Sequence, residues 1–146
     1  MHPAAAKALF DGEVAKFTPA LAVRRGWEFH ALEFPLIDCS FTAPGRTTLR
    51  LHLQCNDWND LPPAIGLHNA DGSILTTMPS NPTGVFNMST HPATGRPFIC
   101  MRGSREYHSH PSHITDSWEN LKGNTSSYSL GGILTQLWNA WQKGRG

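Results

Sequence analysis

Apolar and polar residues follow two different periods along the chain. From Thr47 to Cys55 leucines alternate with polar side chains, which is the two-residue period of a half-buried strand. Near the C-terminus the apolar residues recur three and four positions apart, which predicts an amphipathic helix over 129–142 that Gly144 ends. The residues of this apolar stripe are Leu130, Ile133, Leu134, Leu137, Trp138 and Trp141. The two periods predict a sheet that packs against helices.

The other elements follow from the same rules. Alanines and apolar residues at helical spacing predict a helix over 4–17, and Pro19 bars its continuation. Strands are predicted over 27–33, 34–41, 47–55, 64–68 and 73–77. Residues 79–97 are rich in Pro, Gly, Asn, Ser and Thr and predict an ordered loop. The chain is therefore expected to be a single α+β domain over 1–146, with an N-terminal helix, an antiparallel meander, a long loop and a C-terminal helix.

Composition narrows the class of protein. The chain has 146 residues, of which 39% are hydrophobic and 16% charged, and its net charge is +1. This is a soluble globular composition without the basic surface that nucleic-acid binding needs. An apolar run long enough to span a membrane and the apolar core of a signal peptide are both missing from the sequence. Three cysteines without a Cys-x-x-Cys pair predict free thiols and a cytoplasmic location.

The cysteines differ in their surroundings. Cys39 and Cys55 alternate with apolar residues in predicted strands and are expected in the core. Cys100 follows the long loop, where an accessible thiol can act as a nucleophile. The alternative for Cys100 is a buried structural cysteine. His91-Pro92, at the start of the same region, is expected to fix the loop, with an acid–base role for His91 as the alternative.

A histidine cluster follows Cys100. His108, His110 and His113 fall within six residues, and Asp116 comes shortly after. In an extended segment, His-x-His places both imidazoles on one side, a geometry that suits zinc. Two other interpretations stay open: the cluster is a polar surface insertion, or one imidazole or Asp116 lies over Cys100. In that last position the group would take a proton or donate to an oxyanion.

Several short motifs resemble one known family. His91-Pro92, Gly95 and Ile99-Cys100-Met101 occur in the order seen in ubiquitin-conjugating enzymes. Trp118 is similar to the tryptophan that follows the catalytic cysteine there, and a Pro-Pro pair precedes the active-site loop in both. The chain is accordingly identified as a compact, divergent, bacterial-type member. Ala93 stands where that family has an Asn that is held to stabilise the oxyanion.

The resemblance implies a fold and a function. The fold would be ubiquitin-conjugating-enzyme-like, and the protein an acyl transferase that carries a ubiquitin-like protein as a thioester on Cys100. An activating enzyme would dock on helix 4–17 and load the cysteine, which would pass its cargo to an amine or another acceptor, without cofactor or metal, in a bacterial pathway such as antiviral defence. Independently of the resemblance, the candidate auxiliary residues around Cys100 are His91, His108, His110, His113 and Asp116.

Two alternatives come from other classes of protein. A catalytically silent scaffold of the same fold would bind a ubiquitin-like protein without chemistry, which the missing Asn favours. A zinc isopeptidase-like hydrolase would use the His108/His110 segment, because His-Ser-His-Pro resembles a motif of such enzymes. The residues that should follow that motif are not at the expected positions.

Overall fold

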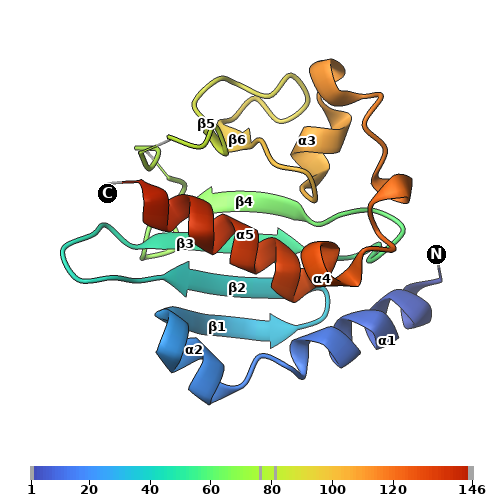
Figure 1. The fold of residues 1–146 in the computed structure, drawn as a ribbon, viewed down its shortest axis with the longest axis horizontal. Coiled ribbons are helices and arrows are strands. Elements are labelled where there is room, and N and C mark those ends of the chain that lie inside the picture. Colours follow the sequence, from blue (N-terminus) through green and yellow to red (C-terminus); the bar gives the residue numbers. More distant parts are fainter. Residues whose placement is uncertain (1, 76, 81, 145–146) are drawn as a thin grey trace.

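A computed structural model describes residues 2–75, 77–80 and 82–144 and shows an α+β fold (Figure 1). Four antiparallel strands form a sheet in the order β1-β2-β3-β4, and α5 crosses one face of it. A two-stranded sheet and α3 lie beyond the β4 edge. The elements are α1 (Pro3–Val14), α2 (Pro19–Arg25), β1 (Trp27–Glu33), β2 (Leu36–Phe41), β3 (Leu49–Gln54), β4 (Ala64–His68), β5 (Phe86–Asn87), β6 (Phe98–Ile99), α3 (Arg105–Ser109), η1 (Pro111–His113), η2 (Trp118–Asn120), α4 (Thr125–Tyr128) and α5 (Leu130–Lys143).

The meander has the predicted strands except the last. The strands expected over 27–33, 34–41, 47–55 and 64–68 are confirmed, with ends that differ by up to two residues. The strand expected over 73–77 is wrong: within the described part of this segment, Ile74 forms an isolated bridge with His68. Thr76 lies outside the described residues. Asn69 donates to the Ser73 hydroxyl and the Ile74 carbonyl, and such local hydrogen bonds favour a turn over a ladder.

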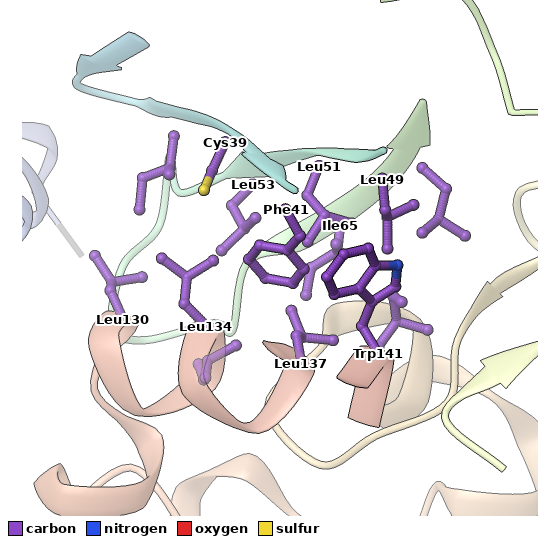
Figure 2. Packing of buried hydrophobic residues seen from close by; sticks show 14 of the residues in the cluster. Cys39, Phe41, Leu49, Leu51, Leu53, Ile65, Leu130, Leu134, Leu137 and Trp141 are labelled. Atoms are coloured by element: carbon purple, nitrogen blue, oxygen red, sulfur yellow. The ribbon is translucent and has the colours of Figure 1, made fainter. Parts of the chain in front are cut away.

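The core lies between the sheet and α5. Alternate residues of β2 and β3 face the apolar stripe of the helix, as Figure 2 shows. The sheet side chains Cys39, Phe41, Leu49, Leu51 and Leu53 and the helix side chains Leu130, Leu134, Leu137 and Trp141 are all at most 1% exposed. Burying a side chain of this size contributes about 1.5–3 kcal/mol. The prediction of helix 129–142 is confirmed, and Ser129 caps it by accepting from the Gly132 amide.

The N-terminal region contains two helices instead of the single predicted helix over 4–17. The first ends at Val14, and a second begins at Pro19 after the Thr18 cap. Proline at the first position of a helix fits, because its missing N–H has no partner there in any case. The second helix ends at Arg25, and its C-cap Gly26 has a left-handed φ of 72°, which favours glycine. The pattern correctly placed a break near Pro19 but missed the helix after it.

The region that carries the histidines is made of short elements. The loop predicted over 79–97 contains β5, which pairs with β6 immediately before Cys100; Asn81 lies outside the described residues. The segment between Cys100 and Trp118 folds into α3 and η1. Among the helices of the described residues, none has the length and hydropathy needed to cross a lipid bilayer.

Candidate functional site

Cys100 leaves the sheet at the end of β6. Its amide donates to the Val85 carbonyl at 2.7 Å, which continues the pairing of β5 and β6 by one residue. Its side chain is half-buried, whereas Cys39 and Cys55 are at most 1% exposed. Burial raises the pKa of both core thiols to about 12, so they stay protonated at neutral pH. Of the three thiols, that of Cys100 is the one within reach of a reagent.

The Cys100 thiol has two polar neighbours. Burial raises the pKa of the thiol, and a hydrogen bond with the Asn87 side chain opposes this effect. The His113 Nε2 atom lies 3.7 Å from the Cys100 Sγ atom. Because the resting group is a thiol at neutral pH, a nucleophilic role requires a proton acceptor, and His113 is in position for it.

His113 is held by an aromatic and ionic network. Its ring stacks on the Tyr107 ring, with the centroids 4.1 Å apart. The Tyr107 hydroxyl donates to Asp116 Oδ2 at 2.7 Å, and Arg102 Nε donates to the same oxygen at 2.7 Å. The Tyr107 hydrogen bond and then Arg102 hold the pKa of Asp116 below its ordinary value, so the carboxylate is charged at neutral pH. Asp116 therefore positions His113 through Tyr107.

His91 is fully buried and joins the loop to α3. Its Nε2 atom lies 2.8 Å from the Glu106 carbonyl, and its Nδ1 atom accepts from the Ala93 amide at 3.0 Å. A carbonyl only accepts, so this network assigns the neutral imidazole with the proton on Nε2. Both ring nitrogens are engaged, which fits the structural role expected for His91. Ser104, fully buried as well, donates to the Ile99 carbonyl and ties β6 to the start of α3.

The other two histidines are engaged elsewhere. The expectation that His108 and His110 lie in an extended segment is wrong, because His108 is in α3 and His110 is its C-cap. His108 Nδ1 donates to the Asp116 carbonyl, and its Nε2 accepts from the Gly103 amide. His110 Nδ1 contacts the amide and hydroxyl of Ser112, and its ring stacks on Phe98.

This arrangement also bears on metal binding. An extended segment would have placed two imidazoles on one side, where both could bind one ion. In the structure His108 lies in α3 and His110 is its C-cap. Across residues 2–75, 77–80 and 82–144, His, Cys, Asp and Glu side chains form no group of three or more that could hold a metal ion.

Glu106 is a feature that the sequence analysis missed. It is 7% exposed, and its carboxylate accepts from the Ile65 amide of the edge strand β4, with Oε1 at 2.5 Å. Burial raises its pKa to about 7. It lines a cavity of about 580 Å³ between β4 and the loop before Cys100. The contact fixes α3, and with it the histidine segment, against the sheet. The sequence does not reveal this contact, because an acidic residue in the first turn of a short helix is common.

Asn87 was missed as well. It lies in β5, within a segment that the composition predicts as loop, so the pairing with β6 is not visible in the pattern. Its Oδ1 atom accepts from the Ser89 amide at 2.8 Å, the local turn that Asn favours. The available sequence signal for such a turn was Asn87-Met88-Ser89, which follows the apolar residue Phe86. It does not indicate that the other end of the amide meets Cys100.

Comparison with known proteins gives one family. A family model named Y4jH-like and described as the Y4jH family matches residues 69–144. The matched region contains Cys100, Asn87 and the whole histidine segment. This match overturns the assignment to the ubiquitin-conjugating enzymes, which rested on short motifs and lacked the Asn at Ala93. The comparison with curated proteins gives no match.

Proposed function

From the premise that the chain belongs to the Y4jH-like family, we propose that it is an acyl transferase with Cys100 as its nucleophile. The observation that carries this proposal is the pair of Cys100 Sγ and His113 Nε2, 3.7 Å apart on an irregular, partly exposed segment. Nucleophile and base within such reach are the arrangement that acyl transfer needs, and contacts of this kind are often long before substrate binds.

The reaction has two balanced steps. In the first, the Cys100 proton passes to His113, the sulfur attacks the carbonyl carbon of an incoming thioester, and a new C–S bond forms as the old one breaks. The leaving thiolate takes the proton. In the second, an amine attacks the same carbon, the C–N bond forms and the C–S bond to Cys100 breaks. The proton lost by the amine returns through His113 to the Cys100 sulfur. Thioester exchange is close to isoenergetic, so positioning contributes more than activation.

The acyl group that we propose is the C-terminus of a ubiquitin-like protein. Support comes from the order of the elements, since N-terminal helices, an antiparallel meander, a cysteine segment and a C-terminal helix resemble the ubiquitin-conjugating layout. The likeness concerns the layout alone and not family membership. On this proposal α1, which leaves Leu9 42% exposed, docks the activating enzyme, and an amine-bearing protein is the acceptor. Three free thiols suit the reducing cytoplasm as its compartment.

A peptide thioester tests the nucleophile without the natural partner. The probe is a short peptide with a C-terminal glycine, activated as a thioester of mercaptoethanesulfonate. Intact-mass spectrometry should show one added peptide on the wild type, released by excess thiol and mapped to Cys100. Cys100→Ser should lose the thiol-sensitive adduct, because a hydroxyl is a far weaker nucleophile. Cys55→Ala, the matched control in the core, should keep it.

His113 supplies the second part of the test. His113→Gln should slow acylation at neutral pH by about 100-fold, the low end of what general base catalysis contributes. His30→Gln is its matched control, since that ring contacts Ser40 within the meander and should leave the rate unchanged. An adduct that persists in Cys100→Ser, or no adduct on the folded wild type, would contradict the proposal. The second result would favour a non-catalytic scaffold.

A further inference from the structure

Asn87 and Cys100 lie on one face of the small sheet formed by β5 and β6. Asn87 is directly opposite Phe98 in the register, and Cys100 is two residues beyond Phe98. Residues two apart on a strand point to the same side, and diagonal neighbours across a strand pair are within reach of each other's side chains. The Cys100 amide donates a hydrogen bond to the Val85 carbonyl at 2.7 Å, which extends this register to the cysteine.

The direction of the Asn87 amide is fixed by its second contact. Its Oδ1 atom accepts from the Ser89 amide at 2.8 Å and is thereby turned toward the chain that follows. An Asn side chain has one oxygen acceptor and one NH₂ donor, so the group that faces the sulfur is the NH₂. An N–H that donates to the sulfur stabilises the thiolate, and the Asn87 side chain lowers the pKa of the Cys100 thiol against the effect of burial.

We propose that Asn87 is a catalytic residue that donates its side-chain N–H to the Cys100 thiolate and then to the oxyanion formed on it. The second half of this statement rests on the proposed function, and the first half does not. When the thiolate sulfur becomes acylated, it loses its charge and most of its capacity to accept hydrogen bonds. The carbonyl oxygen of the new thioester is two bonds from that sulfur, and it gains charge when an amine attacks. The N–H that faced the thiolate can then donate to that oxygen from the β5 side, with His113 left free for the proton.

The size of the effect follows from general values. A hydrogen bond to a charged group is strong enough to change a thiol pKa by about one unit or more. Loss of one oxyanion donor slows a reaction by about 100-fold or more. A purely structural role of Asn87, through the Ser89 turn alone, would produce neither a change in the thiol pKa nor a selective loss of transfer.

The first measurement is the pH profile of Cys100 alkylation by iodoacetamide, followed by peptide mapping. Asn87→Ala should move the midpoint of the profile up by about one unit or more. Asn87→Asp, which has the same shape and a negative charge, should move it further. Met88→Ala, a neighbour that is 72% exposed, should overlay the wild type. Protection of Cys39 and Cys55 in the same digest shows that each variant is folded. A profile of folded Asn87→Ala that overlays the wild type would overturn the proposal.

The second measurement is transfer from a preformed peptide thioester on Cys100 to lysine. Asn87→Ala should slow the transfer by about 100-fold at a pH where both proteins are loaded. A shifted alkylation profile with unchanged transfer would overturn the oxyanion half and leave the thiolate half standing. Failure of the wild type to load would instead contradict the proposed function, while the alkylation profile still decides the Asn87 contact.

Discussion

The two halves of the molecule are built by different forces. The meander and α5 are held by apolar side chains in regular alternation, and their core residues are almost completely buried. The segment from Val85 to Trp118 has two-residue strands and helices of at most five residues. It anchors Phe86, Ile99 and Trp118 in the core, and single polar contacts such as His91 to Glu106 and Ser104 to Ile99 join its short elements. The regular alternation of the first half spreads its stability over many side chains. In the second half, single contacts such as Tyr107 to Asp116 determine where a side chain near Cys100 lies.

The largest expected effect is on the core. Leu134 is fully buried between α5 and the sheet, so Leu134→Ala should lower the free energy of unfolding by about 3–5 kcal/mol. Leu9→Ala, on the exposed side of α1, is the matched control and should cost well under 1 kcal/mol. Urea unfolding measures both. If Leu134→Ala also moved the pH profile of Cys100 alkylation in the folded protein, the two halves would not be independent of each other.

The second effect concerns Glu106 and pH. Its folded pKa of about 7 lies above the ordinary value of 4.5, so between these values the folded state binds more protons than the unfolded state. Stability from this group is therefore present below about pH 4.5 and is lost as pH rises through 7, by up to about 3 kcal/mol. Glu106→Gln should remove that slope from unfolding curves measured across the range. Glu119→Gln changes an exposed carboxylate and should keep it. A wild type whose stability rises over this range would contradict the assignment.

The smallest effect separates the two kinds of cysteine. Cys39→Ala and Cys55→Ala should each lower stability by about 1 kcal/mol, because each leaves a small cavity in the core. Neither should change the rate at which Cys100 is alkylated or acylated. Thermal unfolding and peptide mapping check the two statements. Loss of Cys100 acylation in either folded variant would mean that a core cysteine belongs to the site.

The same contrast explains what the sequence could predict. The strands of residues 27–68 and the helix that became α5 follow from periodicity, because burial on one face imposes it. Cys100 was found as the candidate nucleophile and His113 as one of several imidazoles near it. The choice among the histidines depends on where α3 begins and ends, which is set by the Ser104 N-cap and by Pro111 rather than by any period.

Asn87 and Glu106 were out of reach for a related reason. Each makes a polar contact with a residue that is distant in the sequence. Asn87 contacts Cys100, 13 residues away, and Glu106 contacts Ile65, 41 residues away. Such single polar contacts leave no repeat in the sequence. The family assignment failed similarly, since a His-Pro pair and an Ile-Cys-Met segment are short enough to recur in unrelated chains.

The most direct test of the central claim is the rate at which a peptide thioester on Cys100 is transferred to lysine. The reference is the same peptide on a free cysteine derivative, at the same pH and lysine concentration, with both followed by mass spectrometry. A catalytic site predicts transfer from Cys100 at least about 100-fold faster than from the free thiol, and a loss of that advantage in His113→Gln. Equal rates for Cys100 and the free thiol would show that the cysteine is merely accessible and would contradict the account.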